Sequence, residues 1–147
     1  MKEKVNIKKL TETAIIPTYG TEFSAGADLY ADNAEEITIK AHETVLIKTG
    51  IALEIPIGYA GLIYARSGLA SKKGLAPANK VGVVDADYRG EVMVALHNHT
   101  NEDKTIDKHE RIAQIVIAPF LKADFVEVET LNDTVRGTGG FGSTGTK

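Results

Sequence analysis

Short runs of alternating apolar and polar residues occupy much of the chain. The alternation over residues 5–8, 37–39 and 45–55 predicts half-buried β-strands, because alternate side chains of a strand lie on opposite faces. After the turn Pro56-Ile57-Gly58 the strand pattern resumes over residues 59–64. Short strands with frequent turn signals favour an all-β sandwich or barrel.

The strongest apolar run, RIAQIVIAPF over residues 111–120, predicts a central strand, and residues 125–128 predict a last strand. Residues 67–73, SGLASKK, differ in kind. There we expect a short helix that Ser67 caps and Gly74 ends.

The composition changes near the C-terminal end. Residues 136–145, RGTGGFGSTG, are half glycine, and such a segment buries too little apolar surface to order itself. We therefore expect a β domain over residues 1–132 and a mobile tail over residues 133–147.

Composition and charge limit the classes of binding partner that the sequence favours. A chain of 147 residues with 43% hydrophobic and 25% charged residues is typical of one ordinary globular domain. The net charge of -3 provides no electrostatic footprint for nucleic acid or an anionic membrane, so we expect neither as a partner. No cysteine, no membrane-length apolar run and no signal-like N-terminus occur, so we expect a cytoplasmic protein.

The segment GVVDADYRGEV, residues 82–92, carries the main candidate chemistry. Two apolar runs flank a tight polar segment, which predicts a β-hairpin. Asp85 and Asp87 lie two apart and would share a face, with one of them buried and able to activate a water, while Tyr88 adds a flat apolar face. A plain turn explains the same letters, because Asp and Gly are turn residues.

Two other segments suit an anion. In the tail, glycines let backbone N–H groups approach a phosphate, Arg136 can grip it, and Phe141 can stack on a base. The same composition is also typical of a disordered end. Arg66-Ser67-Gly68 opens the expected helix, where free N–H groups suit a phosphate or an ordinary cap.

Several polar residues have two readings on sequence alone. Asp28 in a strand of small residues and Gln114 in an apolar run are each consistent with a structural or a functional role. His97 and His99 lie two apart, but a pair without a third ligand is a weak zinc signal, and we interpret both as structural.

Five stretches stand in a fixed order: AGADLYA (25–31), ARSGLA (65–70), GVVDADYRGEV (82–92), ERIAQIV (110–116) and RGTGGFGSTG (136–145). Together they resemble the motifs of the trimeric dUTP diphosphatase (dUTPase) family. Two positions depart from that pattern, because Ala65 stands where the family usually has proline and His109 where it usually has glycine.

The resemblance implies a jelly-roll β fold and a homotrimer whose active sites combine several subunits. It implies hydrolysis of dUTP to dUMP and diphosphate, which supplies the dTTP precursor and keeps uracil out of DNA. It also implies Mg²⁺ on the triphosphate.

The resemblance further implies residue roles. Asp85 is the base that activates the water attacking the α-phosphorus, and Tyr88 packs under the deoxyribose and excludes a 2′-hydroxyl. The residues implied to read or line the uracil pocket are Asn79, Gly82, Val83, Val84 and Met93.

At the triphosphate, the implied binding residues are Arg66, Ser67, Gly68 and Gln114. Asp28 supports the water shell of Mg²⁺, so no direct protein ligand is expected; Asp85, Asp28 and Gln114 form the implied catalytic set. The tail residues implied to close over the substrate are Arg136, Phe141, Gly142 and Ser143, with Thr144 beside them.

Three alternatives remain open at this stage. A dCTP deaminase has a related fold, although the tail and the 82–92 segment argue against it. A regulatory protein that uses this scaffold to bind another protein is a second. A purely structural jelly roll is a third, and it leaves the five motifs unexplained.

Overall fold

The computed structural model of the chain describes residues 3–143. Its elements in order are β1 (Asn6–Lys9), β2 (Thr18–Tyr19), β3 (Ala27–Tyr30), β4 (Ile37–Ile39), β5 (Thr44–Glu54), β6 (Tyr59–Tyr64), the short helix η1 (Leu69–Lys73), β7 (Leu75–Pro77), β8 (Gly82–Val84), β9 (Glu91–Asn98), β10 (Lys104–Ile106) and β11 (Arg111–Pro119).

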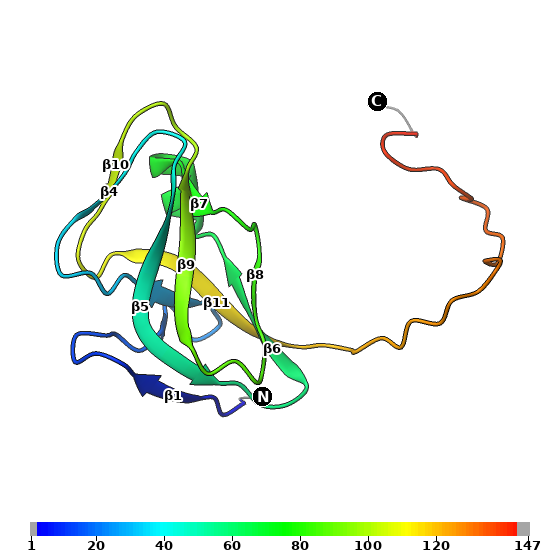
Figure 1. Ribbon diagram of the computed structural model, residues 1–147, viewed down its shortest axis with the longest axis horizontal. Helices are drawn as coiled ribbons and strands as arrows, with labels where there is room; N and C mark the ends of the chain where they lie inside the picture. The colour runs from blue at the N-terminus through cyan, green and yellow to red at the C-terminus, as the bar shows by residue number, and fades with distance from the viewer. Residues whose placement is uncertain (1–2, 144–147) are drawn as a thin grey trace.

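Two antiparallel sheets pack on one apolar core (Figure 1). One sheet has the strand order β1-β5-β9-β7 and the other has the order β2-β3-β11-β6-β8, while β4 and β10 form a separate ribbon. Both sheets contribute to the core, for example through Leu29 and Ile115 from one and Val94 and Leu96 from the other. The predicted all-β fold with one short helix is confirmed.

The apolar run near the end of the sequence forms the central strand, as predicted. β11 lies between β3 and β6, and Ile112, Ala113 and Ile115 are buried. β11 pairs with β3 from Arg111 to Ile115 and with β6 from Gln114 to Pro119, so it has a partner on both sides at Gln114 and Ile115. Its position decides where the side chains around it meet.

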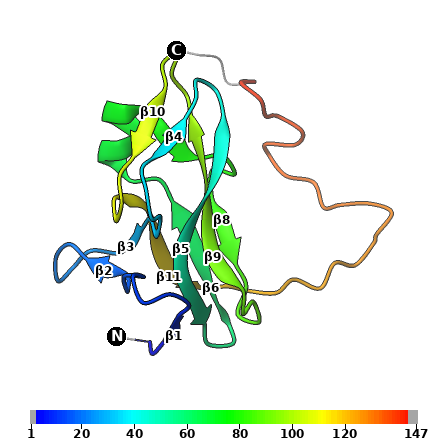
Figure 2. The ribbon, with the colours of Figure 1, turned by 60° about the vertical axis from the view of Figure 1, so that its left-hand side comes forward.

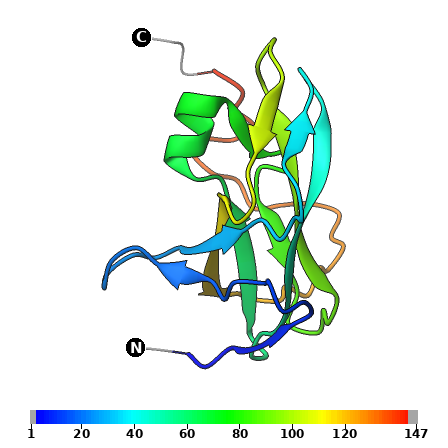
Figure 3. The same cartoon turned by 90° about the vertical axis from the view of Figure 1, so that its left-hand side faces the viewer.

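The short helix is present over the predicted residues 67–73, but the predicted side-chain cap is wrong. η1 is a single turn of π type that ends at Gly74, whose φ of 68° is left-handed and favours glycine. Ser67 and Gly68 already have helical conformation, and no side chain caps the turn at Leu69–Lys73, so Ser67 does not act as the predicted cap. Figure 3 shows the helix as the green coiled ribbon. No helix among residues 3–143 is long and apolar enough to cross a membrane.

The predictions for residues 82–92 and 125–128 are wrong for a common reason. In neither segment do the residues pair with the strand that the sequence pattern predicts as a neighbour. β8 pairs with β6 and β9 pairs with β5 and β7, so residues 82–92 form a crossing between sheets and not a hairpin. Residues 125–128 form no strand, and Phe125 is 93% exposed. From Phe120 onward the described chain runs outside the sheets in irregular conformation (Figure 2).

His109 adopts a backbone conformation that favours glycine. Its φ is 60°, and its N–H donates to the Ala31 carbonyl at 3.1 Å. Its Nδ1 is buried without a hydrogen-bond partner among the described residues. A left-handed conformation costs a non-glycine residue about 1–2 kcal/mol, so this departure from the motif carries a local cost.

We expect His109→Gly to raise the free energy of unfolding by about 1 kcal/mol. The change removes left-handed strain of about 1–2 kcal/mol and a buried unpaired nitrogen, and it adds back about 0.5–1 kcal/mol of backbone entropy. Urea unfolding at one fixed protein concentration measures the difference. His42→Gly is the matched control, because His42 has a φ of 61° but an Nε2 bonded to Asn101, and its gain is smaller. A less stable His109→Gly variant would contradict the assignment of strain.

Candidate active site

Three distant segments meet at one end of the five-stranded sheet. The register of β11 places Gln114 opposite Asp28 of β3 on one side and opposite Tyr64 of β6 on the other. Arg66 follows Tyr64 by two residues, so the chain leaving β6 passes the same point. These segments enclose a hollow of about 390 Å³, which we call the Arg66 cavity. Its lining residues are Gly20, Ser24, Ala25, Gly26, Asp28, Arg66, Ser67, Gly68, Arg111 and Gln114.

Asp28 holds two guanidinium groups in this cavity. Arg66 Nε donates to Asp28 Oδ1 at 2.7 Å, and Arg111 Nη1 donates to Oδ2 at 3.3 Å. The Asp28 side chain is only 14% exposed, whereas that of Arg111 is 51% exposed. Two positive charges against one negative charge make the cavity suitable for an anion, and a planar guanidinium suits phosphate oxygens.

Gln114 is oriented by its neighbours. Its Nε2 donates to the Ala65 carbonyl at 2.8 Å, which fixes the plane of the carboxamide. Gly26 makes room for that carboxamide, because a Cβ at Gly26 would collide with Gln114. The glycine of the first motif therefore permits the glutamine of the fourth motif to lie in the cavity.

A second hollow, of about 260 Å³, forms where the chain crosses between the two sheets, and we call it the Tyr88 cavity. Gly82 allows the approach of the walls, because a Cβ there would lie 3.2 Å from Asn79 Nδ2 and 3.3 Å from Ile63 Cβ. The lining residues are Leu46, Ile63, Asn79, Gly82, Val83, Val84, Asp85, Tyr88, Glu91, Val92 and Met93.

A tight turn presents Asp85 and Tyr88 to this cavity. The Tyr88 N–H donates to the Asp85 carbonyl at 3.2 Å, and the Tyr88 hydroxyl donates to the Glu91 carbonyl at 2.9 Å. Gly90 lies under the Tyr88 ring, where a Cβ would meet the phenol group. Hydrogen bonds therefore fix both the backbone of Tyr88 and its hydroxyl group, and together they hold the ring in one place.

The prediction that Asp85 or Asp87 is buried is wrong, because both side chains are exposed. They also lie in no strand, so the shared strand face does not apply. Both acids line a neighbouring hollow, but only Asp85 also lines the Tyr88 cavity. The structure thus separates two acids that the sequence treats alike.

The tail residues lie apart from both cavities. Arg136 Nε donates to the Gly139 carbonyl at 2.8 Å, and Phe141 is fully exposed. Arg136, Phe141, Gly142 and Ser143 line a local hollow of the tail itself. Thr144 lies outside the described residues.

The cavities also contain residues that the sequence prediction missed. Ser24 and Arg111 line the Arg66 cavity, and Leu46 and Ile63 line the Tyr88 cavity. Arg111 stands inside the fourth motif, three residues before Gln114, so its position was available as a signal. Leu46 and Ile63 belong to ordinary strand patterns, and only the packing of the sheets brings them to the site.

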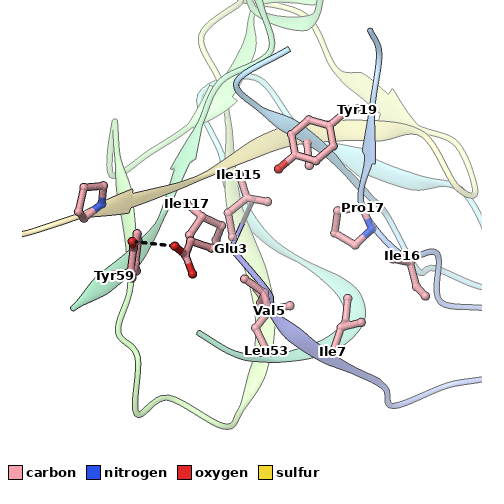
Figure 4. A pocket seen from close by; sticks show the side chains of 12 residues that line it. Glu3, Val5, Ile7, Ile16, Pro17, Tyr19, Leu53, Tyr59, Ile115 and Ile117 are labelled. Carbon is pink, nitrogen blue, oxygen red and sulfur yellow. Dashed lines mark hydrogen bonds between the residues drawn. The ribbon is translucent and has the colours of Figure 1, made fainter. Parts of the chain in front are cut away.

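A third hollow is apolar in character. This apolar groove, of about 560 Å³, lies between β1, β2 and β11, where Val5, Ile7, Ile115 and Ile117 come together (Figure 4). At its rim the Tyr59 hydroxyl donates to Glu3 Oε1 at 3.1 Å, and this hydrogen bond raises the pKa of Tyr59. The aliphatic lining suits apolar side chains and not a nucleotide.

Comparison with known proteins agrees with this geometry. The family model described as dUTPase matches residues 12–145. The chain belongs to the dUTPase family.

Individual relatives cover nearly the whole chain. A deoxyuridine 5'-triphosphate nucleotidohydrolase of Nautilia profundicola is 54% identical over 142 residues, which is 97% of this chain and 99% of the relative. That of Hydrogenobaculum sp. is 48% identical over 144 residues, 98% of this chain and 99% of the relative. The solved structure of a Staphylococcus bacteriophage 80alpha dUTPase with dUPNHPP is 29% identical, with a TM-score of 0.88, 99% of this chain and 100% of that chain covered.

Membership of the dUTPase family confirms the resemblance carried by the five motifs, and it removes the reading as a dCTP deaminase. It also confirms the predicted fold class.

Proposed function

We propose that the chain hydrolyses dUTP to dUMP and diphosphate. The base and sugar of the substrate lie in the Tyr88 cavity of one subunit, and the triphosphate lies at the Arg66 cavity of another subunit. The reaction is that of the dUTPase family to which the chain belongs. One observation supports the proposed residue roles. The residues expected to contact uracil line the Tyr88 cavity, and the β-domain residues expected to contact phosphate line the Arg66 cavity.

Asp85 acts as the base. Its carboxylate accepts a proton from a water whose oxygen bonds to the α-phosphorus, and the bond from the α-phosphorus to the bridging oxygen breaks to release diphosphate. Tyr88 lies under the deoxyribose, where its fixed ring leaves no room for a 2′-hydroxyl. The backbone of Gly82 to Val84, with Asn79, reads the edge of uracil, and Met93 closes the cavity.

The size of the cavities supports this division. About 260 Å³ is below the range of about 300–1,000 Å³ that holds drug-sized ligands, so the Tyr88 cavity suits a nucleoside better than a nucleoside triphosphate. Arg66, Ser67, Gly68 and Gln114 then bind phosphate oxygens outside it, with Arg111 beside them.

Magnesium fits the donors that are present. No group of three or more His, Cys, Asp or Glu side chains among residues 3–143 could cage an ion, and Mg²⁺ keeps its waters and prefers phosphate oxygens. The ion neutralises charge on the triphosphate when bound. Asp28 would support its water shell with the lone pairs that Arg66 and Arg111 leave free, and Asp28 also positions both guanidinium groups.

We infer a homotrimer from two features of the single chain: its two cavities are not joined, and its C-terminal segment leaves apolar side chains exposed. The Tyr88 and Arg66 cavities share no lining residue, although one substrate has to occupy both kinds of site. Phe125 and Leu131 are 93% and 87% exposed on a segment without a strand partner, and burying such side chains stabilises by about 1.5–3 kcal/mol each. Contacts with neighbouring subunits would bury this segment and join the two cavities.

The tail, residues 133–147, closes over the site of another subunit in this proposal. Ordering each residue costs about 1–2 kcal/mol, and a hydrogen bond to a charged group returns about 1.5–3 kcal/mol. Several phosphate contacts from Arg136, Gly142 and Ser143, with Phe141 stacked on the base, are needed to offset that cost. The tail therefore closes on a triphosphate and stays mostly open on dUMP.

The first test is diphosphate release from dUTP, dTTP, dCTP and UTP in Mg²⁺. We expect release from dUTP alone, and a loss of at least 100-fold in kcat for Asp85→Asn, as expected when a general base is removed. Asp87→Asn is the matched control, because Asp87 lies outside the Tyr88 cavity, and it keeps kcat within about threefold. Equal losses in both variants would sink the assignment of Asp85.

The shared site predicts complementation between two inactive variants. Co-expressed Asp85→Asn and Arg66→Ala chains form mixed trimers in which some sites combine an intact Asp85 from one chain with an intact Arg66 from another. Random mixing in a cyclic trimer restores about one quarter of the wild-type activity. Activity no higher than that of the separate variants would mean that one chain supplies both residues.

Removing the tail tests its role separately. A chain that ends at Val135 should lose at least tenfold in kcat/KM for dUTP, because the contacts of Arg136 and Phe141 are gone. Its far-ultraviolet circular dichroism and Tm should stay near wild type, since none of the described residues from Arg136 to Ser143 belongs to the buried core. An unchanged kcat/KM would exclude closure of the tail as a step in the reaction.

A further inference from the structure

His97 and His99 form an imidazole pair at the end of β9. Their ring centroids are 4.7 Å apart, and the ring planes are inclined by 67°. Along β9 buried residues alternate with partly exposed ones, and His97 is on the partly exposed face. His99 follows two residues later on the same side and is exposed to solvent.

The backbone that carries the two rings is held rigidly. Asn98, between them, is fully buried. Its Nδ2 donates to the carbonyls of Ile39 at 3.0 Å and Glu102 at 2.7 Å, and its Oδ1 accepts from the Thr100 N–H at 2.9 Å. The two flanking histidines are therefore presented from a fixed strand end, which is how a preorganised ligand pair is built.

A hydroxyl group orients the first ring. Thr44 Oγ1 lies 2.9 Å from His97 Nδ1, across the β5–β9 ladder, where Thr44 and His97 are direct partners. With Nδ1–H donating to that hydroxyl, His97 Nε2 carries the lone pair. Histidines that bind metals usually donate their other N–H in this way, which fixes the ring and its tautomer.

We propose that His97 and His99 bind a divalent transition-metal ion, Zn²⁺ in the first instance, at a site separate from the nucleotide and its Mg²⁺. Tetrahedral Zn–N bonds of about 2.0–2.1 Å place two ligand nitrogens about 3.3 Å apart and their ring centroids about 5 Å apart. The observed 4.7 Å is close to that separation, so little movement is needed to bind. Imidazole suits zinc and copper, whereas Mg²⁺ prefers oxygen ligands.

In the described part of the chain, the two histidines are the only side-chain ligands available at this site. No third ligand-type side chain from residues 3–143 completes the group, and the positive charge of Lys80, which acts on His99, opposes a cation. Water fills the remaining positions, and the affinity is moderate.

The sequence alone led us to interpret the two histidines as structural because they lack a third ligand. Three features change that reading: the centroid separation, the Thr44 hydroxyl on His97 and the fixed Asn98 between the rings. None of them can be read from the spacing of the two residues.

Titration of Zn²⁺ into the full chain, in Mg²⁺ buffer without nucleotide, tests the proposal by calorimetry. We expect one Zn²⁺ per chain, and an affinity at least tenfold weaker in His97→Asn and in His99→Asn. His42→Asn is the control, because His42 is exposed and bonds to Asn101, and its affinity stays within twofold of wild type. No binding by the wild type, or equal loss in the control, overturns the proposal.

Two further readouts separate metal binding from folding and from catalysis. In the wild type, Zn²⁺ should shift the imidazole proton signals of two of the four histidines, and a shift in neither or in all four overturns the assignment. The His97→Asn and His99→Asn variants should keep kcat/KM for dUTP within twofold, since neither residue lines the Tyr88 or the Arg66 cavity. A parallel loss of activity would place the pair in the nucleotide site and overturn its separateness.

Discussion

The pairing of β11 between β3 and β6 is the constraint on which the rest of the structure depends. In this register Ile115 is buried and Gln114 faces the Arg66 cavity. A shift of one residue would exchange the faces of the strand, move Gln114 toward the core and expose Ile115. Because burial of one such side chain contributes about 1.5–3 kcal/mol, the apolar core selects the register that assembles the cavity.

The Tyr88 cavity depends on a different feature, the crossing of the chain between the two sheets. β8 is an edge strand of one sheet and β9 lies inside the other, so the residues between them have to span the gap. The turn from Asp85 to Tyr88 occurs in that span, and the close approach at Gly82 occurs at the start of β8, just before it. A simple hairpin would pair β8 with β9 and leave no hollow between their sheets.

The two cavities also show how far one chain goes toward an active site. Asp28, Arg66 and Gln114 are already held by hydrogen bonds before any ligand is present, so the anion side is preorganised. Asp85 is exposed in the single chain, and the hydrogen bonds of tail residues 134–143 stay within the tail. In the proposed trimer the neighbouring subunit and the tail supply the exclusion of water that a general base and a triphosphate need. The His97–His99 pair stands apart from this arrangement and depends only on the end of β9.

The sequence by itself determined the fold class, the central strand over residues 111–120 and the motif residues that line the two cavities, since strand periodicity and short motifs are local properties of the chain. It did not distinguish Asp85 from Asp87, because spacing says nothing about which of the two acids lines the Tyr88 cavity. It also mispaired β8 with β9 and assigned a strand to residues 125–128, because a strand pattern does not name its partner. Only the tertiary structure decided the register around Gln114, the place of Arg111 beside Asp28 and the geometry of His97 with His99. Each of these features is a contact between side chains on different strands or at strand ends. Packing of the core, and not distance along the chain, sets how close those side chains lie.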